Sequence, residues 1–413
     1  MSYSEWRTTK LSNLIETVSE TYKFDKNQKV VLINTSDILE GKVLNHNLVL
    51  PLNIAGQFKK QFKKNDILYS EIRPANKRYA YIDFESKNYV ASTKLMVLRR
   101  KNNQIDNKFL FQYLKSNDTL RTLQAIAESR SGTFPQITFT ELSNLEINLP
   151  TEKEQKAIAN ILSSLDDKIE LNNKINKNLE ELAQTLYKRW FVDFEFPNED
   201  GEPYKSSGGE MVESELGLIP KEWELSNLLE IADYMNGIAV KKYAADEGEI
   251  SIPVLKIKEL GLGNITSDSD RCNLSVPEKY IIKKGDLIFS WSGTLLVDFW
   301  TGSKSVLNQH LFKVSSNKYP RWFYYYWTKY HLEKFQNIAK SMATTMGHIK
   351  RDDLSKSLVV IPVNNHLEQG SIILEPIIDE ILKLRIQNNK LSKLRDELLP
   401  KLMNGEIEVP IEE

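Results

Sequence analysis

The sequence predicts an α+β protein made of two tandem mixed α/β domains, each followed by a long helix. Three observations lead to this prediction. A heptad pattern occurs twice, the second time 216 residues after the first. Motifs outside the heptads recur at offsets of 212 to 220 residues. Short β-branched and aromatic runs alternate with helical patterns in both halves. These features indicate that one folding unit was duplicated along the chain.

The two predicted long helices carry apolar residues at alternating four- and three-residue steps, as in a coiled coil. Each copy covers roughly 40 residues, which corresponds to about 60 Å of helix. Both copies place an asparagine at the same seam position, where a buried polar residue costs stability but fixes register. Two unrelated amphipathic surface helices are the alternative. The positions predicted to line the seam are Ile161, Leu165, Asn172, Ile175, Leu182, Leu186, Ile377, Ile381, Asn388, Leu391, Leu398 and Leu402.

The repeat extends beyond the helices. Residues 63–70 match residues 283–290, each a turn signal followed by an apolar strand, and residues 124–129 match residues 336–341. The segments before residue 63 and between residues 290 and 322 show almost no correspondence. A duplicated frame with two unlike interiors indicates two modules that do the same job on different targets.

The elements within each module follow from residue type. Strands are predicted where β-branched and aromatic residues gather, in a mixed or antiparallel sheet. Helices are predicted at 108–127 and 321–339. The aromatic run 322–327 fits a base-stacking platform or a helix core, and its alignment with 109–114 favours the core. The predicted strands are 29–33, 67–70, 79–84, 94–99, 145–149, 252–257, 287–291, 311–314 and 358–361.

The domain boundaries follow from composition. Residues 196–222 are rich in Pro, Gly, Ser and acidic residues, which is typical of a linker. We therefore expect a first domain at 1–150, a first long helix at 151–195, a linker at 196–215, a second domain at 216–362, and a second long helix with a C-terminal tail at 363–413.

Overall composition narrows the functional class. Residues 1–150 hold 22 Lys+Arg against 15 Asp+Glu, and residues 223–362 hold 18 against 15, while the helices and the linker are acidic. Positive modules suit a polyanionic partner. Cys272 is the one cysteine, which excludes a disulfide framework. No apolar run reaches ~18 residues and no signal-peptide pattern is present, so we expect a cytoplasmic protein without a membrane partner.

No catalytic constellation emerges from the sequence. A phosphate-binding G-x-x-x-x-G-K-[ST] loop and an H-E-x-x-H motif are both absent. The five histidines show no metal-ligand spacing, so no metal site is predicted. The noticeable polar segments are the loops 130–137 and 343–351, at matched positions after each module's helix. Their hydroxyl, amide, imidazole and cationic side chains suit phosphate and base-edge contacts, although an ordinary surface loop fits equally well.

Over essentially its whole length the chain resembles the specificity (S) subunit of type I restriction–modification enzymes. The resemblance rests on the duplicated halves, on Leu149-Pro150 and Glu154-Gln155 before the first long helix, on the Trp190-Phe191-Val192-Asp193-Phe194 run after it, and on the 214–223 junction. It implies two target recognition domains, each reading one half of a bipartite double-stranded DNA site. The two long helices would then pack antiparallel as a coiled coil with pseudo-twofold symmetry.

The resemblance also implies partners and cofactors. The helices would dock two methyltransferase (M) subunits that carry S-adenosylmethionine, and restriction (R) subunits would add ATP- and Mg²⁺-dependent steps. This chain would then bind no cofactor itself and would not be an enzyme alone. The candidate DNA-binding residues are Arg73, Lys77, Arg78, Arg130, Ser131, Thr133, Gln136, Lys304, Lys340, Thr344, Thr345, His348, Lys350 and Arg351.

Two departures between the halves matter. Met346-Gly347 stands where the first module has Phe134-Pro135, so the second loop can differ in shape. Pro376 is expected to start or kink the second long helix. Two other functions compete with DNA recognition: a protein-interaction scaffold with two globular modules on a coiled-coil stalk, and a nuclease that acts alone.

Overall fold

The computed structural model describes residues 6–25, 27–51, 56–129, 135–341 and 347–411. The chain forms two units. Unit 1 takes residues up to Lys168 together with the segment from Ser392 onward, and unit 2 takes Ile169–Leu391. Two long helices, α4 (Glu152–Tyr187) and α10 (Asn364–Met403), each contribute residues to both units.

Unit 1 is a mixed α/β module with its own hydrophobic core. A four-stranded antiparallel sheet has the order β2-β10-β7-β8, and a second sheet, β3-β9-β6, contains one parallel pair. Its helices are α1 (Asn107–Leu114), α2 (Asn117–Ser129) and α3 (Phe139–Ser143). Its strands are β1 (Arg7–Lys10), β2 (Ile15–Thr17), β3 (Val31–Ile33), β4 (Ile38–Leu39), β5 (Lys42–Val43), β6 (Phe58–Gln61), β7 (Ile67–Ser70), β8 (Tyr79–Tyr81), β9 (Tyr89–Ser92), β10 (Leu95–Arg100) and β11 (Glu146–Leu149).

Unit 2 repeats this frame. The sheet β15-β22-β19-β20 has the same order as β2-β10-β7-β8, and the pair β14·β23 corresponds to β1·β11. Its short helices are α5 (Leu228–Ile231), α6 (Ile257–Leu262), α7 (Arg321–Tyr330), α8 (Leu332–Ser341) and α9 (Arg351–Ser355). Its strands are β12 (Met211–Ser214), β13 (Gly217–Pro220), β14 (Glu224–Asn227), β15 (Asp233–Asn236), β16 (Ser251–Leu255), β17 (Arg271–Asn273), β18 (Ile281–Ile282), β19 (Leu287–Ser290), β20 (Val297–Phe299), β21 (Ser305–Leu307), β22 (Leu311–Ser315) and β23 (Leu358–Ile361).

The repeated Lys-Lys-x-Asp motif is a turn that positions the central strand of each frame. Asp66 Oδ2 accepts the Lys63 N–H at 2.8 Å, and Asp286 Oδ2 accepts the Lys283 N–H at 2.8 Å. The residue before each aspartate is left-handed, Asn65 at φ 71° and Gly285 at φ 89°. Only glycine and asparagine adopt this conformation routinely, which explains the two residue types found there.

The helix predicted in each module is interrupted. Residues 107–129 form α1 and α2 rather than one helix, and residues 321–341 form α7 and α8. The Ser116 hydroxyl accepts the Thr119 N–H at 3.2 Å, so this serine caps a new helix start. The prediction of one helix in each module was therefore wrong, and in unit 1 the local bond at Ser116 starts the second helix.

The aromatic run 322–327 belongs to the core. All six side chains are buried, none more than 9% exposed, so the core assignment is confirmed and they offer no base-stacking surface.

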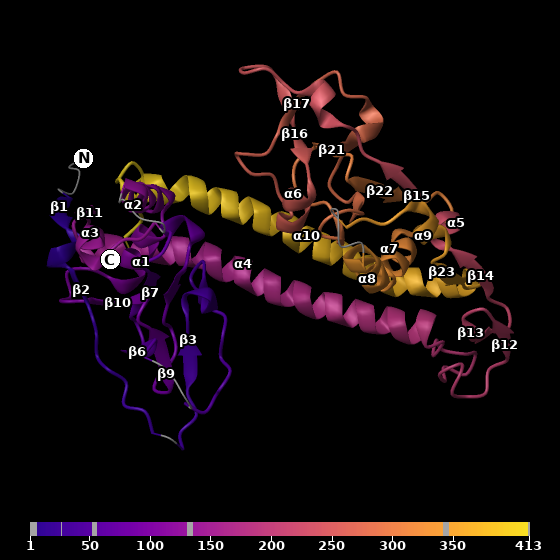
Figure 1. Ribbon diagram of the computed structural model, residues 1–413, viewed down its shortest axis with the longest axis horizontal. Coiled ribbons are helices and arrows are strands. Elements are labelled where there is room, and N and C mark those ends of the chain that lie inside the picture. Colours follow the sequence, from indigo (N-terminus) through magenta and orange to yellow (C-terminus); the bar gives the residue numbers. More distant parts are fainter. Residues whose placement is uncertain (1–5, 26, 52–55, 130–134, 342–346, 412–413) are drawn as a thin grey trace. The chain divides into compact units, whose positions relative to one another are not determined.

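The two long helices pack against each other in antiparallel order within each unit, and they lie side by side in Figure 1. In unit 1, Leu162 of α4 shares a core with Leu399 of α10. In unit 2, Asn172 Nδ2 donates to Asn388 Oδ1 at 2.8 Å, which confirms the predicted asparagine pair. Farther along α4, Glu180 pairs with Arg385 of α10 at 2.6 Å. Positions that advance along α4 thus contact earlier positions of α10.

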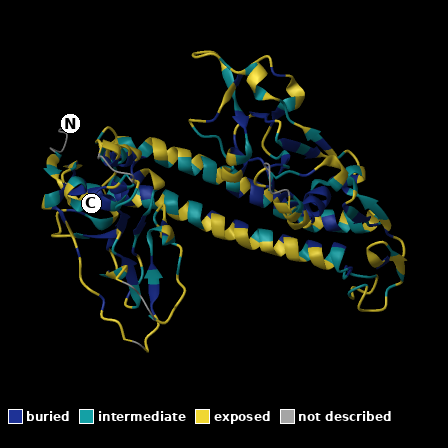
Figure 2. Ribbon diagram, viewed as in Figure 1, coloured by how far each residue is buried: buried dark blue, intermediate teal, exposed yellow. Residues whose placement is uncertain are grey.

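The seam prediction is one residue out of step in the second half of α4. Ile175 and Leu182 are 36% and 49% exposed, whereas Asn176 and Ala183 beside them are buried. The prediction assumed that the largest apolar residues face the partner helix, but small and amide side chains occupy that position. The alternation of buried and exposed turns is visible in Figure 2. Of the other predicted positions, Asn172, Ile381 and Leu402 are buried, and Ile161, Leu165, Leu186, Ile377, Asn388, Leu391 and Leu398 are partly buried.

Pro376 was expected to start or kink the second long helix, and a start there is wrong, because α10 begins at Asn364 and is continuous through Pro376. A proline within a helix leaves the carbonyl four residues earlier without its usual donor. That residue is Ile372, which is 74% exposed. The hydrogen bond that Pro376 cannot donate is therefore missing on the exposed side of a continuous helix.

The segment predicted as a linker is an ordered part of unit 2 rather than an open tether. It contains the β12–β13 hairpin, and Phe196 is 1% exposed. Phe196 stacks on Trp223 with ring centroids 4.9 Å apart and on Tyr204 at 4.6 Å. The polar composition that indicated a linker belongs to the exposed turns, while its few aromatic residues bury the segment.

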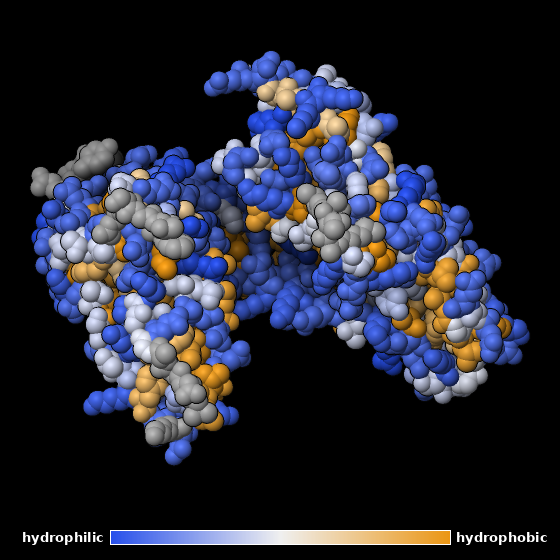
Figure 3. All heavy atoms as spheres, viewed as in Figure 1, coloured by the Kyte–Doolittle hydropathy of each residue, from blue (hydrophilic) through white to orange (hydrophobic). Residues whose placement is uncertain are grey.

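Side chains on the face drawn in Figure 3 are mostly hydrophilic, with smaller apolar areas over each unit. Among the described helices, none is long and apolar enough to cross a membrane.

Candidate nucleic-acid interface

Three backbone segments meet beyond the end of β7 in unit 1. They are residues 70–73, the turn 92–94 between β9 and β10, and residues 135–137, which lead to α3. Ile72 and Gln136 form an isolated antiparallel bridge. The other backbone bonds run from Glu71 N–H to Lys94 O, from Ile137 N–H to Glu71 O and from Arg73 N–H to Pro135 O, at 3.1, 2.8 and 3.0 Å. We call these residues the three-segment face of unit 1.

Unit 2 builds the same arrangement from residues 290–293, 308–310 and 347–349. Ser292 and His348 form the corresponding bridge. The backbone bonds run from Trp291 N–H to His310 O, from Ile349 N–H to Trp291 O and from Gly293 N–H to Gly347 O, at 3.4, 3.0 and 2.8 Å. The turns 92–94 and 308–310 have equivalent side-chain hydrogen bonds. Ser92 Oγ accepts the Lys94 N–H, and Asn308 Oδ1 accepts the His310 N–H. The duplicated frame therefore carries a duplicated face.

Arg73 holds an unusual backbone conformation on the face of unit 1. Its φ is 44°, in the left-handed region, and its counterpart Gly293 has φ 65°. A residue with a side chain costs roughly 1–2 kcal/mol in this region, whereas glycine does not. Strained residues gather at functional sites, so an exposed arginine at this position points to a role for its side chain.

The face of unit 1 is electropositive. Gln136 and Lys94 are exposed beside Arg73. Lys60 donates through Nζ to Leu95 O at 2.7 Å, next to Lys94. Burial lowers the pKa of Lys60, the neighbouring cations Lys59 and Lys94 lower it further, and Glu71 opposes them. Several cations thus surround one carboxylate, which suits a phosphate-rich ligand.

Two predicted cations of unit 1 already have protein partners. Lys77 pairs with Glu40 at 3.0 Å, and Arg78 donates to the carbonyls of Ser36 and Ile38. These contacts hold the β7–β8 connection against the β4 region. Arg78 is thus committed to structure more than the sequence pattern indicated, while the partly exposed Lys77 pair can still exchange.

The predicted residues of unit 2 are distributed differently. His348 lies on the three-segment face, and Lys350 is the exposed residue that precedes α9. Arg351 donates to Tyr234 O at 3.3 Å. Lys340 is exposed in the last turn of α8. Lys304 precedes β21 whereas His310 follows it, so Lys304 lies at the opposite end of that strand and is not brought to the face.

Five of the predicted residues fall outside the described part of the chain: Arg130, Ser131, Thr133, Thr344 and Thr345.

Sequence reasoning missed the turn of each face. Lys94 in unit 1 and Gln309 and His310 in unit 2 lie on it. Their signal was the 216-residue offset that relates residues 92–94 to 308–310, the same offset as in the long helices. It was hidden because the side chains differ although the backbone is the same.

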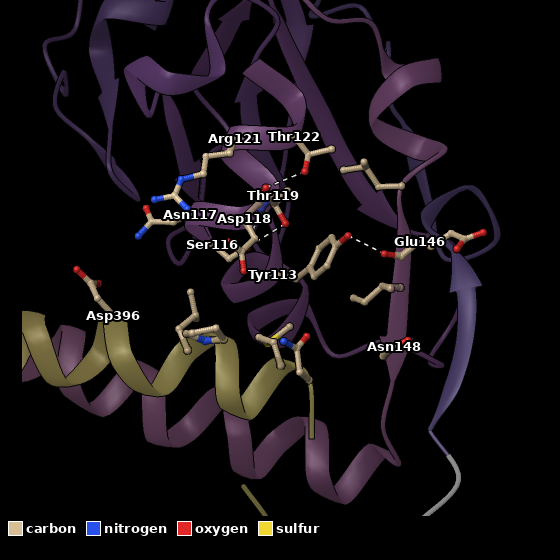
Figure 4. A pocket seen from close by; sticks show the side chains of 16 residues that line it. Tyr113, Ser116, Asn117, Asp118, Thr119, Arg121, Thr122, Glu146, Asn148 and Asp396 are labelled. Atoms are coloured by element: carbon tan, nitrogen blue, oxygen red, sulfur yellow. Dashed lines mark hydrogen bonds between the residues drawn. The ribbon is translucent and has the colours of Figure 1, made fainter. Parts of the chain in front are cut away.

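A pocket of about 360 Å³ lies elsewhere in unit 1, beside the α1–α2 connection, β11 and the last turns of α10 (Figure 4). Tyr113 donates to Glu146 O at 2.8 Å on its wall. Its charged lining consists of Asp118, Glu146 and Asp396 with Arg121, and it includes none of the predicted DNA-binding residues. Within the described ranges, no His, Cys, Asp and Glu side chains form a metal-binding group.

Comparisons with known proteins agree with this architecture. The type I restriction modification DNA specificity domain matches residues 3–181 and 220–391. The chain is 32% identical to the type I restriction enzyme HindI specificity subunit of Haemophilus influenzae, over 98% of this chain and 100% of that protein. It is 29% identical to the MjaIX specificity subunit of Methanocaldococcus jannaschii, over 73% and 69%.

A crystal structure of the type I restriction-modification S subunit from M. genitalium shares the fold. Its TM-score is 0.56 at 16% identity, with 96% of each chain covered. The family match spans both halves of the duplicated frame, each including its three-segment face. The chain therefore belongs to the family of DNA specificity subunits of type I restriction–modification systems.

Proposed function

We propose that the three-segment face of each unit binds one half of a bipartite double-stranded DNA site. The observation that carries this proposal is the pair of faces with the same backbone bonds and different side chains. Because the two backbones are alike, both faces would dock on duplex DNA in the same orientation. Because their side chains differ, they would recognise different base sequences. As a member of its family the chain is the recognition subunit and is not catalytic by itself.

Within this proposal Arg73 and Gln136 serve the first half-site, and His348 and Lys350 serve the second. The cations Lys77, Lys340 and Arg351 would contact phosphates, which position a protein without reading sequence. The candidates outside the described residues, including Arg130 and Thr345, would extend each face. Arg78 and Lys304 are the weakest candidates because of their positions. We assign residues 1–150 and 216–362 as the two recognition domains.

The long helices would set the distance between the half-sites. Both α4 and α10 run from one unit into the other, and each is longer than 35 residues. A paired helix of this length is stiff, so the permitted gap between half-sites should be narrow.

Binding to duplexes with increasing gaps tests this function. We expect one gap length to bind best, and an added or removed base pair to weaken binding, because the second face then meets the wrong part of the duplex. Fluorescence anisotropy on full-length chain at fixed salt measures this, with a scrambled duplex of equal length as the control. Equal affinity for all gaps and for the scrambled duplex would exclude the proposal.

The second half of α4 offers a surface for the methyltransferase subunits. Leu171, Ile175 and Leu182 are 49%, 36% and 49% exposed and lie on one helix face. An exposed apolar stripe of this kind suits a helix of a partner protein. We place two methyltransferase subunits on the helical region and restriction subunits on that assembly. S-adenosylmethionine, ATP and Mg²⁺ would be bound by these partners in the cytoplasm, where the DNA target lies.

Substitutions in the stripe test this docking. Leu171→Glu with Leu182→Glu should abolish co-purification with the methyltransferase subunit, because two charges would be buried in the interface. Melting temperature should change little, since both side chains are half exposed. The matched control is Glu181→Gln on an adjacent exposed position of α4. Retention of the methyltransferase by the double variant would place its docking surface elsewhere.

A further inference from the structure

The turn of the three-segment face has the same backbone hydrogen bonds in the two units but different side chains. In unit 1 it presents Thr93 and Lys94, and in unit 2 it presents Gln309 and His310. Lys94 and Gln309 are both exposed. A cation in one module thus corresponds to an amide and an imidazole in the other.

The side chains of the unit 2 turn are held in a defined orientation. His310 Nδ1 lies 3.1 Å from Ser292 Oγ, and Gln309 Nε2 lies 3.3 Å from His310 Nε2. Because an amide nitrogen can only donate, His310 Nε2 accepts this bond, so Nδ1 carries the proton and donates to Ser292. Trp291 flanks the imidazole with ring centroids 5.8 Å apart. Gln309 is thereby oriented through contacts from Trp291 and Ser292, which follow β19.

The remaining groups of Gln309 match one base edge. After one N–H is used on His310, the amide keeps a second N–H and both lone pairs of its oxygen. A donor and an acceptor in this spacing fit adenine N7 and N6 in the major groove. The ammonium group of Lys94 presents donors only, which fit guanine O6 and N7.

We infer that this turn determines base preference in each half-site, with Gln309 reading an adenine in one and Lys94 a guanine in the other. His310 is a positioning residue for Gln309. The inference rests on the proposed function, because it assumes that each face meets a half-site. It adds a segment that the flanking loops 130–137 and 343–351 do not include.

Binding selection on a pool of duplexes with both half-sites randomised tests the inference, using full-length wild-type chain and single variants. Gln309→Ala should remove a preference for adenine of roughly 5- to 150-fold at one base pair of one half-site. The other half-site should keep its preferences. Lys94→Ala should remove a guanine preference in the other half-site. His310→Ala should weaken the same adenine preference as Gln309→Ala without a change in melting temperature.

Lys284→Ala is the matched control, because Lys284 is exposed and precedes β19, whereas the face lies beyond the other end of that strand. It should leave every base preference unchanged. The double substitution Gln309→Thr with His310→Lys gives unit 2 the Thr-Lys pair of the unit 1 turn. It should change the preference at that base pair from adenine to guanine. Unchanged preferences in Gln309→Ala, or an equal loss of binding to all sequences, would overturn the inference while the proposed function stands. A wild-type chain without any sequence preference would overturn both.

Discussion

At the scale of single residues, position in the frame decides which side chains act on a ligand and which hold the structure. Asp66 and Asp286 occupy equivalent turns, yet their cationic partners differ. Arg99 donates two hydrogen bonds to the Asp66 carboxylate, from Nε at 2.8 Å and Nη2 at 2.7 Å. Lys313 forms a single ion pair with Asp286 at 2.9 Å. These carboxylates lie in the frame of each sheet and serve stability. Arg73, by contrast, is exposed, and its left-handed backbone is shared with Lys77, whose side chain pairs with Glu40.

Replacing Arg73 with glycine should separate stability from binding. The left-handed backbone is relaxed in Arg73→Gly, so the free energy of unfolding should stay equal or rise by about 1 kcal/mol. Affinity for the first half-site should fall roughly 5- to 150-fold, the range for one lost base contact. Urea denaturation and anisotropy measure the two effects. Gly293→Arg is the mirror control and should be destabilising. Unchanged affinity in Arg73→Gly would remove this arginine from the interface.

His331 should make unit 2 sensitive to acid. Burial lowers the pKa of His331 to about 4, and its Nε2 lies 2.8 Å from Leu358 O. Between pH 6.5 and 4 the unfolded chain binds a proton at this imidazole and the folded chain does not. Stability is therefore fully present above about pH 6.5 and falls by roughly 1.4 kcal/mol per pH unit below it, levelling near pH 4.

Melting temperatures of wild-type and His331→Gln chains across this pH range test the effect. The variant should lack the part of the acid-induced loss that comes from this imidazole. His366, whose pKa burial also lowers, remains in both proteins and cancels in the comparison. Parallel curves for the two proteins would show that His331 takes up its proton equally in the folded and unfolded chains.

At the scale of elements, the long helices combine polar register control with charged attachment of the modules. Arg385 of α10 binds Glu180 of α4 and Asp298 of β20, each at 2.6 Å. Arg395 of α10 binds Asp166 of α4 at 2.9 Å, and the same carboxylate pairs with Lys115 after α1. In each unit an arginine of α10 thus forms an ion pair with a carboxylate of α4. In unit 2 the arginine also pairs with Asp298 of the α/β module, and in unit 1 the α4 carboxylate also pairs with Lys115.

The asparagine cluster should trade stability for register. Asn172 is fully buried and donates to Gln387 and Asn388, and Asn388 donates to Asn173 at 2.8 Å. Changing Asn172 and Asn388 to leucine should raise the melting temperature by a few degrees, since apolar seams are more stable. Wrong registers or higher oligomers should appear on light scattering. Asn178→Leu, on the exposed face, is the control; an unchanged or lower melting temperature in the double variant would contradict the seam role.

At the scale of the whole molecule, the expected dependence on gap length follows from carrying two faces on one chain. Once one face is bound, the second binds its half-site at an effective concentration set by the connection between them. With a stiff connection, the effective concentration of the second face is high at one distance from the first face and low at other distances. Two readers would then act as one specific reader, and the gap would become part of the recognised site.

The sequence alone determined the duplication, the paired asparagines, the family and part of the strands of each frame. The frame strands β7, β8, β10, β11, β19, β22 and β23 were predicted, whereas β1, β2, β14, β15 and β20 were not. The predicted features follow from the local spacing and types of residues, and the same spacing occurs in both copies of the repeated backbone. Only the tertiary structure decided that Ile175 and Leu182 face outward, that residues 196–222 are packed, and that the turns carrying Lys94 and Gln309 complete each face. These depend on which surfaces meet across long sequence separations, and unlike side chains at 92–94 and 308–310 conceal a shared backbone. Packing and backbone hydrogen bonds, which residue type specifies only weakly, make that decision.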